Sequence, residues 1–582
     1  MGGFILAKRD NGLTMDETEE SLGNLLDIFN KKNLPLNRKV VTGDYVIYVY
    51  HKYKYPVENV LTFDDDRFII ATGSLIYDGK TGCDALISLY DDFSEDCSFL
   101  SKTLGQYCLI VSKNGKLYLL NDSAGIYPVY TDISGTVISS SFLAVFKSLK
   151  KKTIAPQELY EFLFSETFHG NKTLIQEIDT VDRTKMLLLS KQTSIISKKP
   201  TEKTIDGTRS VTELIEQVSD SLLDYFTILK NNFGDSICSA ISGGFDSRLM
   251  LAAMRKVGIK PYLYVYGNDT STDVRIAKLI AEGEKLPLKY ENNNNYVKRN
   301  PKEFMELLEQ YYYWFDGLGY EFGVFDTGFD MYSRLKRADN ARLQLHGAGG
   351  EVFRNRLSLP ERSYDLLPVL KATFDNMVPS LVTDAFDAPA YFDSLQQKCR
   401  PLFDNRIHRL NRQEIEIVYP LFILNYWLGH NTKINNQFVY TIYPFSEISN
   451  ITMSLDIPVS YKKQWAFNAA LITAIDPALA SYPSQYGFRF SEYNNIPFMI
   501  KYKNNLKTYA PPSLKAYVRK HFWKRVDLGK DKFPYYFEKE YLETIFPSKE
   551  LRISEYINID SIVDSTMLAR ALSVELLMND RF

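Results

Sequence analysis

The feature that most constrains the fold is a glycine-rich turn between a strand-type and a helix-type sequence. The apolar run 236–241 leads directly into Ser-Gly-Gly-Phe-Asp-Ser-Arg at 242–248, and helical spacing follows over 247–257. Strand and helix patterns then alternate over 262–266, 272–284 and 288–290. Strands that alternate with helices imply right-handed crossovers, so this part of the chain predicts a doubly wound parallel sheet.

The first 200 residues follow a different pattern, in which turn sequences separate short strands as in antiparallel hairpins. Strand-type runs lie at 39–51, 68–75, 107–112, 116–121, 136–141 and 184–190, and helical spacing at 18–30 and 155–164. A polar segment at 190–212 lacks the periodicity of a packed element and marks a boundary. We predict two domains, 1–200 and 208–500, with additional helices in the second and a helical extension at 501–582.

Composition limits the partners and the compartment. In 582 residues, 69 basic side chains balance 71 acidic ones to a net charge of -2, so no overall field favours nucleic acid or a membrane surface. The five cysteines include no CxxC pair, which argues against a zinc site and a disulfide framework. The apolar run at the start is too short for us to expect a signal peptide, and no run approaches the about 18 apolar residues of a membrane span. We expect a cytoplasmic protein that binds neither nucleic acid nor membrane.

The glycine-rich turn has the chemistry of an anion-binding loop. Gly243 and Gly244 let the backbone approach an anion closely. Ser242 and Ser247 add hydroxyl donors at the N-terminus of a helix, whose dipole favours negative charge. Asp246 is a candidate Mg²⁺ ligand, or else a helix cap. The spacing fits neither a Walker loop nor a dinucleotide fingerprint, and it favours pyrophosphate binding over a plain strand-to-helix turn.

These residues also carry a family resemblance. Ser-Gly-Gly-Phe-Asp-Ser at 242–247 resembles the Ser-Gly-Gly-x-Asp-Ser loop of the ATP pyrophosphatases, which cleave ATP to AMP and pyrophosphate. Within that group the wider match is to the asparagine synthetase family. In that family the loop is followed by a strand and by a helix with an acidic residue, and Asp273 matches that position.

A second glycine segment extends the resemblance. Gly-Ala-Gly-Gly-Glu at 347–351 is similar to the family's Gly-x-Gly-x-Asp-Glu, without its Asp. The resemblance implies that Gly347 and Gly349 join the nucleotide site. It also implies that Glu351 acts in catalysis and binds Mg²⁺ together with Asp246. The alternative is an ordinary glycine-rich loop after a short strand.

The N-terminal half resembles the first domain of the same family, a class II glutamine amidotransferase fold of two antiparallel sheets. Residues 104–130 are similar to its strand, turn and Arg-Asp-x-x-Gly-x-x-Pro-Leu-Tyr segment, with Asn121 in place of the Arg. Residues 138–146 and 71–79 resemble neighbouring strands, and the similarities span most of 1–490. The implied fold class is α/β and α+β in two domains, the first an antiparallel β-sandwich flanked by helices.

One departure from the family decides the source of the amine. The amidotransferases begin Met-Cys-Gly and use the cysteine as nucleophile, whereas this chain begins Met1-Gly2-Gly3. Thr-Gly-Ser at 72–74 replaces the Asn-Gly-Glu segment that binds glutamine. We predict that glutamine is not hydrolysed, as in the β-lactam synthetases and lasso-peptide cyclases, which take the amine from their own substrate.

A second departure concerns the leaving group. The family's Arg-x-Lys-x-x-Phe segment supplies a lysine that neutralises the leaving pyrophosphate, and Gln485 stands at that position here. Arg489, Lys463 and Lys501 are candidate replacements, and we take Arg489 as the catalytic one. Glu447 lies in a segment similar to the family's Arg-x-Pro-Phe-Leu-Asp beside the acceptor pocket, so it is a catalytic candidate or a helix N-terminal acid.

The sequence as a whole predicts a ligase that uses ATP and Mg²⁺. It adenylates a small-molecule or peptide carboxylate, releases pyrophosphate and lets an amine displace AMP to form an amide. The alternative is a nucleotide-binding pseudoenzyme or scaffold in a peptide or polysaccharide biosynthetic complex. A homodimer or a biosynthetic partner protein fits both. A tRNA-modifying sulfurtransferase or lysidine-type ligase shares the loop but lacks support from the N-terminal half. His346 and His430 have no partner at metal spacing and are predicted to be structural.

Overall fold

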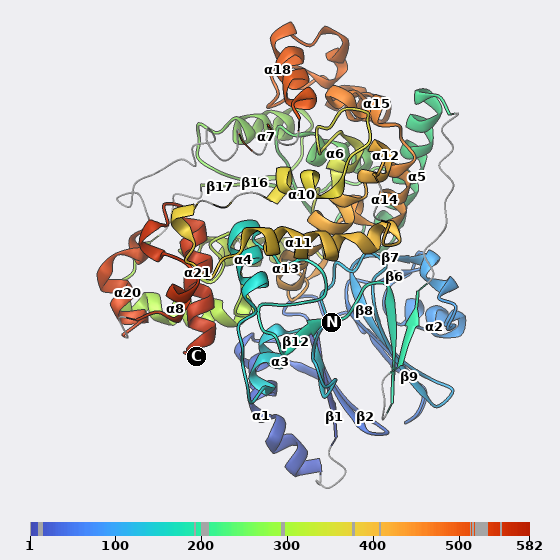
Figure 1. The fold of residues 1–582 in the computed structure, drawn as a ribbon. Coiled ribbons are helices and arrows are strands. Elements are labelled where there is room, and N and C mark those ends of the chain that lie inside the picture. The colour runs from blue at the N-terminus through green and yellow to red at the C-terminus, as the bar shows by residue number, and fades with distance from the viewer. Residues whose placement is uncertain are drawn as a thin grey trace.

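The computed structural model contains two six-stranded antiparallel sheets followed by a five-stranded parallel sheet, with helices around all three (Figure 1). The residues described are 2–9, 15–190, 194–198, 209–292, 297–319, 321–374, 377, 379–406, 409–511, 514, 517, 534–547 and 550–582. The predicted fold class is confirmed. The domain boundaries stay a prediction.

The first sheet has the order β12 (Ile178–Thr180), β10 (Tyr130–Asp132), β11 (Val137–Ser139), β1 (Gly3–Lys8), β3 (Tyr45–Tyr50) and β2 (Leu36–Thr42). The second has the order β14 (Ser194–Ser197), β13 (Lys185–Leu189), β9 (Lys116–Asn121), β8 (Tyr107–Lys113), β5 (Phe68–Gly73) and β4 (Val60–Thr62). A short pair, β6 (Ile76–Tyr77) and β7 (Thr103–Leu104), lies beside them.

These two sheets pack face to face as a sandwich. Phe4 and Leu6 of β1 point into the same buried cluster as Ile70 and Ile110 of the second sheet. Ile5, the residue between them, packs on the opposite face of β1 in a different cluster, which also contains residues of α1 (Met15–Lys31) and α3 (Phe142–Ser148). The period of two in β1 therefore separates the sandwich core from the helix-covered face. Helix α2 (Gly82–Asp92) covers the outer face of the second sheet.

Two strand predictions were wrong in detail. The run 39–51 is not one strand, because Gly43 has φ +50 and the chain turns there, pairing Thr42 with Tyr45 across a two-residue loop. The polar segment 190–212 contains an additional strand, β14, which pairs with β13. Its residues are mostly exposed at the sheet edge, so the sequence shows no buried period that could have revealed it.

The parallel sheet has the order β17 (Leu288–Glu291), β16 (Tyr262–Tyr266), β15 (Ile237–Ala240), β18 (Leu343–Leu345) and β19 (Tyr440–Ile442). Its helices include α5 (Val211–Phe233), α6 (Phe245–Lys256), α7 (Thr272–Gly283), α8 (Pro301–Trp314) and α9 (Phe329–Asn340). From β15 the chain builds outward through β16 and β17, and then returns to the other side of β15 to form β18. The winding direction therefore reverses between β15 and β18, a topological switch point.

Helices fill the rest of the structure. They include α4 (Pro156–Ser165), α10 (Leu366–Phe374), α11 (Ala388–Cys399), α12 (Arg412–Ile415), the π-helical turn η5 (Tyr419–Leu424), α13 (Asn425–Asn435), α14 (Ile448–Leu455), α15 (Val459–Lys462), α16 (Ala466–Ile475), α17 (Pro477–Ala480), α18 (Phe498–Tyr509), α20 (Lys539–Ile545) and α21 (Ser565–Met578). The last two pack near α8 and α4, so the end of the chain returns to the N-terminal part (Figure 1). Among the described residues, no helix is both long and apolar enough to span a bilayer.

Candidate functional site

The turn after β15 closes on itself at the N-terminus of α6. The N–H of Ser242 donates to Oγ of Ser247 at 3.1 Å, and the two hydroxyl oxygens lie 2.9 Å apart. The N–H of Gly244 donates to Oγ of Ser242 at 3.2 Å. The N–H of Gly243 donates to the carboxylate of Asp273, in the first turn of α7, at 2.8 Å. Three loop N–H groups therefore have partners within the protein, and an anion bound to them must displace those partners.

The segment after β18 packs against this loop. A Cβ on Gly350 would lie 2.5 Å from Oδ1 of Asp246, and one on Gly347 would lie 3.2 Å from the Asp246 carbonyl carbon. Gly349 has φ +100, and its Cβ would lie 2.5 Å from Oγ of Ser446. Glycine is therefore needed where the two segments meet. The structure brings the predicted nucleotide-binding residues of both segments together around Asp246.

Arg354 joins the two predicted metal ligands and was not among the predicted site residues. Its Nη2 donates to both carboxylate oxygens of Asp246, at 2.8 and 3.0 Å, and lies 3.5 Å from Glu351. Burial raises the pKa of Asp246 to about 7; Arg354 opposes that shift and Glu351 adds to it. The sequence signal that could have identified Arg354 is its position three residues after Glu351, because side chains at that spacing meet on one face of a helical turn.

Asp246 and Glu351 do not fit a metal ion in this arrangement. A Mg²⁺ site of the predicted kind uses one or two carboxylates together with phosphate oxygens. Here both carboxylates contact one guanidinium, that of Arg354. Within the described part of the chain, no group of three or more His, Cys, Asp or Glu side chains could hold a metal. The predicted Mg²⁺ would require Arg354 to withdraw.

The segment that carries Gln485 lies over the glycines of the loop. The N–H of Gln485 donates to the carbonyl of Gly243 at 3.1 Å, and its Nε2 would lie 3.4 Å from a Cβ on Gly244. Arg248, which is fully buried, fixes the preceding chain by donating to three carbonyls within residues 479–483, at 2.6 to 3.3 Å. The residue at the family's lysine position therefore covers the loop without bringing a charge to it.

The three predicted replacement cations lie at or near the surface, each with another partner. Arg489 lies 3.6 Å from Glu492, Lys463 donates to Glu361 at 3.0 Å, and Lys501 donates to the carbonyl of Asn494 at 3.4 Å. Arg354 is the cation that the structure places against Asp246 in the loop.

Glu351 also faces a small cavity of about 10 Å³, room for about one water molecule, that Arg356, Tyr419 and Lys462 line with it. The ammonium group of Lys462 is buried and lies 3.1 Å from Glu416. Burial raises the pKa of Tyr419 well above its usual range, and the nearby Glu351 carboxylate adds to the shift. The cavity therefore puts Arg356, a phenol and the Lys462–Glu416 pair beside the predicted catalytic carboxylate.

Glu447 lies at the contact between the N-terminal sheets and the parallel sheet. Its carboxylate accepts hydrogen bonds from the N–H of Gly105 at 2.8 Å, from Nε2 of Gln106 at 3.2 Å and from the hydroxyl of Tyr225 at 3.2 Å. Burial raises its pKa to about 8. The neighbouring Ser446 reaches the carbonyl of Ala348 at 3.2 Å, so only this residue of the pair contacts the glycine segment. These contacts place the Glu447 side chain between the N-terminal sheets and the parallel sheet.

The backbone around Gly2 leaves little room for a side chain, and the loss of glutamine hydrolysis stays a prediction. A Cβ at Gly2 would lie 2.4 Å from the carbonyl oxygen of His51, in the chain next to it. Nearby, the buried carboxylate of Asp316 lies 2.7 Å from Nζ of Lys32 and 3.4 Å from Nζ of Lys433. Position 2 therefore has no room for a nucleophilic side chain, and the adjoining space holds ionic contacts between the two halves of the chain.

Comparisons with known proteins leave the family open. No family model matches the chain, and no curated protein does. Several solved structures show weak similarity, and three of them illustrate it. They are an allosteric regulatory enzyme of purine biosynthesis (12% identity, 51% of this chain and 67% of that chain, TM-score 0.23), a glutamine phosphoribosylpyrophosphate amidotransferase from B. subtilis complexed with ADP and GMP (9%, 52% and 70%, 0.21), and the U34-tRNA thiolase NcsA from Methanococcus maripaludis with its [4Fe-4S] cluster (12%, 56% and 86%, 0.21). Similarity at this level supports no functional conclusion.

Proposed function

We propose that the chain is an ATP-dependent ligase that adenylates a carboxylate and forms an amide without hydrolysing glutamine. The observation that carries the proposal is the meeting of the two glycine segments at the carboxyl ends of β15 and β18, around Asp246. In open parallel sheets, ligands bind in the crevice at the point where strand order reverses. The N-terminus of α6 lies at this point and favours a phosphate group.

Arg354 takes the part of the missing lysine in this proposal. Adenylation leaves negative charge on pyrophosphate, and a cation already fixed in place stabilises that charge without reorganisation. A guanidinium also has the planar fork that matches phosphate oxygens. Its two hydrogen bonds to Asp246 support this role, because they orient the guanidinium at the loop.

Nucleotide entry requires the cover over the loop to move. Gln485 and its neighbours occupy the space above Gly243 and Gly244 where a pyrophosphate group would approach. The bonds from Arg248 hold the chain just before Gln485, so displacement of residues 484–488 alone would open the loop. Binding would thus be coupled to a local change in conformation, as in closing and opening loops of other enzymes.

The cavity beside Glu351 is the proposed acceptor side of the site, and it would have to widen to admit a substrate. Arg356 would bind the carboxylate to be activated, and Glu351 would orient the amine or accept its proton. The carboxylate belongs to a small molecule or a peptide. We further propose a cytoplasmic enzyme with no nucleic acid or membrane partner, acting as a homodimer or with a biosynthetic partner protein.

Incubation with ATP and a panel of carboxylates and amines, with pyrophosphate and AMP monitored, tests the proposal. The wild-type chain should release both, and a variant with Ser242→Ala and Ser247→Ala should not. Ser221→Ala, a hydroxyl loss on α5 outside the loop, is the matched control. Release of ADP and phosphate without AMP would contradict the mechanism.

A second candidate function is a nucleotide-binding scaffold without turnover. It is favoured by the internal partners of three loop N–H groups and by Gln485 at the lysine position. Calorimetry with ATP and a non-hydrolysable analogue separates the two candidates. Equal, tight binding of both nucleotides with no AMP under any substrate mixture would favour the scaffold.

A further inference from the structure

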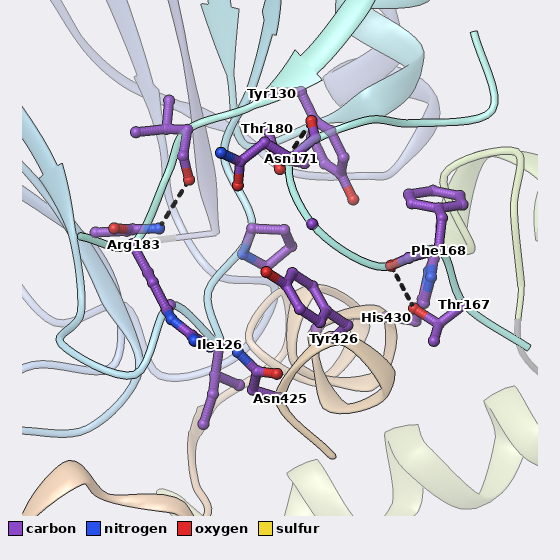
Figure 2. Close-up of a pocket in the computed structure, with 16 residues that line it drawn as sticks. Ile126, Tyr130, Thr167, Phe168, Asn171, Thr180, Arg183, Asn425, Tyr426 and His430 are labelled. Atoms are coloured by element: carbon purple, nitrogen blue, oxygen red, sulfur yellow. Dashed lines mark hydrogen bonds between the residues drawn. The ribbon is translucent and has the colours of Figure 1, made fainter. Parts of the chain in front are cut away.

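A separate pocket lies between the end of the N-terminal sheets and helix α13 (Figure 2). Its cavity volume is about 50 Å³, and about 540 Å³ when the open mouth is included, so a ligand would lie partly in the mouth. Strands β10 and β12, the loop 167–171 and α13 all contribute to its walls. It shares no lining residue with the cavity beside Glu351.

The walls combine aromatic rings with one positive charge. Tyr130, Phe168 and Tyr426 line the pocket, and Arg183 is the one charged side chain among its lining residues (Figure 2). The guanidinium of Arg183 donates to the carbonyl of Leu421 at 2.5 Å and lies 6.0 Å from the Tyr426 ring. No carboxylate of the described residues forms an ion pair with it. The pocket therefore favours a planar ligand with a single negative charge.

Helix α13 adds unused hydrogen-bonding atoms to the same wall. Asn425 and His430 are 1% and 4% exposed, and Oδ1 of Asn425 and Nδ1 of His430 have no hydrogen-bond partner among the described residues. Burial lowers the pKa of His430 to about 3, so its ring is neutral and offers both a donor and an acceptor. Both atoms are enclosed, and buried polar atoms are seldom left unpaired, so a small shift of these side chains toward the pocket would let a ligand or water pair with them.

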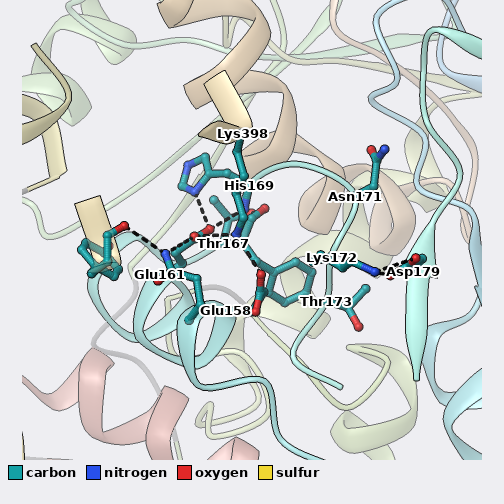
Figure 3. Close-up of polar contacts among 12 residues, drawn as sticks. Glu158, Glu161, Thr167, His169, Asn171, Lys172, Thr173, Asp179 and Lys398 are labelled. Atoms are coloured by element: carbon teal, nitrogen blue, oxygen red, sulfur yellow. Dashed lines mark hydrogen bonds and ion pairs between the residues drawn. The ribbon is translucent and has the colours of Figure 1, made fainter. Parts of the chain in front are cut away.

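The loop 167–171, which packs beside α13, is held by a buried ionic cluster (Figure 3). Glu161 accepts from the N–H of His169 at 2.7 Å and lies 3.0 Å from its Nδ1. Lys398 donates to Glu161 at 2.6 Å and to Glu158 at 2.8 Å. Although burial acts to raise it, these partners hold the pKa of Glu161 at about 2. Because His169 lies within loop 167–171, the cluster fixes the pocket before any ligand binds.

We propose that this pocket binds a small heteroaromatic monocarboxylate. The ring lies among Tyr130, Phe168 and Tyr426, and the carboxylate pairs with Arg183. A ring nitrogen or a bound water meets the free atoms of Asn425 and His430. This site is distinct from the nucleotide loop, and its test does not depend on the proposed ligase activity.

Ligand-observed NMR and calorimetry on the full chain test the proposal with three isosteric probes. Nicotinate should bind, nicotinamide should bind at least tenfold more weakly, and 3-picolylamine should show no binding. In Arg183→Gln the preference for nicotinate over nicotinamide should disappear. Lys185→Gln, which removes a nearby cation of β13 outside the pocket, should keep the wild-type preference.

A thermal unfolding measurement on each variant checks that the fold is intact. His430→Phe keeps the ring shape and removes the polar atoms, so it should weaken nicotinate binding at least fivefold. Absence of nicotinate binding to the wild-type chain would overturn the proposal. Equal nicotinate affinity in wild type and a folded Arg183→Gln would overturn it as well.

Discussion

The family resemblance implies glutamine hydrolysis at the position of Gly2 and nucleotide binding at the loop at Ser242. In this structure the space at both places is filled by other groups, and the groups differ between the two. At Gly2 a side chain would meet the backbone carbonyl of His51 at 2.4 Å. At Gly244 the nearest atoms are side-chain atoms of Ser242 and Gln485, at 3.3 and 3.4 Å. A side chain can rotate away at small cost, whereas backbone held between paired strands cannot. The first place is closed by backbone. At the second, side chains cover Gly244, and the backbone N–H of Gln485 also lies close to Gly243.

Electrostatics separates the two places further. Near Gly2, one carboxylate, Asp316, contacts two buried lysines that come from opposite halves of the chain. At the loop, one guanidinium, Arg354, contacts two carboxylates, Asp246 and Glu351, and all three side chains are partly exposed. The first arrangement therefore contributes mainly to holding the halves together. The second keeps a small solvent-exposed surface, although Asp246 is buried enough for its pKa to rise, and it can exchange partners with a ligand.

The largest expected effect is a loss of folding stability when the ionic contact near Gly2 is broken. Asp316→Asn leaves Lys32 and Lys433 buried without a counter-charge, and breaking a buried pair in this way costs about 3–5 kcal/mol. Urea unfolding measures the loss. The control is Asp339→Asn, whose pair with Lys54 is exposed and contributes about 1 kcal/mol or less. A loss for Asp316→Asn no larger than that of the control would break the comparison.

The same contact gives a pH dependence of known sign. Burial acts to raise the pKa of Asp316, but Lys32 and Lys433 hold it well below its usual range. A depressed pKa means that the unfolded chain binds the proton more readily. The stabilisation is therefore present above the unfolded pKa of about 3.9 and is lost as pH falls through the folded value. The free energy of unfolding of Asp316→Asn should therefore fall less steeply than that of the wild type as the pH is lowered.

Arg354→Met should have the next largest effect, and mainly on nucleotide binding. ATP affinity should fall by about 10- to 100-fold, equivalent to about 1.4–2.8 kcal/mol, because the phosphate-binding cation is lost. Arg354→Lys should recover part of the affinity, since it keeps the charge but not the planar fork. Titration with a fluorescent ATP analogue measures this. Arg342→Met, at the opposite end of β18, is the matched control, and equal affinity in both Met variants would contradict the assignment.

Gly2→Cys tests whether glutamine hydrolysis can be restored at the position of Gly2. We expect no glutaminase activity and a stability loss of about 1–3 kcal/mol, because the new Cβ collides with the His51 carbonyl. Ammonia release from glutamine and thermal unfolding measure the two outcomes. Gly23→Cys, where a Cβ meets nothing within 4 Å, is the control for adding a cysteine. Glutamine hydrolysis by Gly2→Cys would show that this site is intact.

Structure formed by neighbouring residues at these two places could be predicted from the sequence. Contacts between residues far apart in the sequence could not. The strand, loop and helix over 236–257 are contiguous, so turn chemistry and periodicity were enough to place them. The partners of the loop come from Asp273, Arg354 and Gln485, and only packing brings those segments to it. Likewise, Gly2 indicates a missing nucleophile, but the collision with His51 depends on how two strands pair.

Gln485→Lys tests whether the second place can be reopened, and its expected effect is the smallest. The ammonium group would stand over Gly244, where Nε2 of Gln485 now lies, and would face a bound pyrophosphate group. ATP affinity should rise about tenfold, or about 1.4 kcal/mol, less than the loss from Arg354→Met because the lysine is held by fewer contacts. Gln485→Met, which has similar length and no charge, separates the effect of charge from that of displacing the amide. If the Lys and Met variants bind ATP equally, the loop is limited by its cover and not by a missing cation.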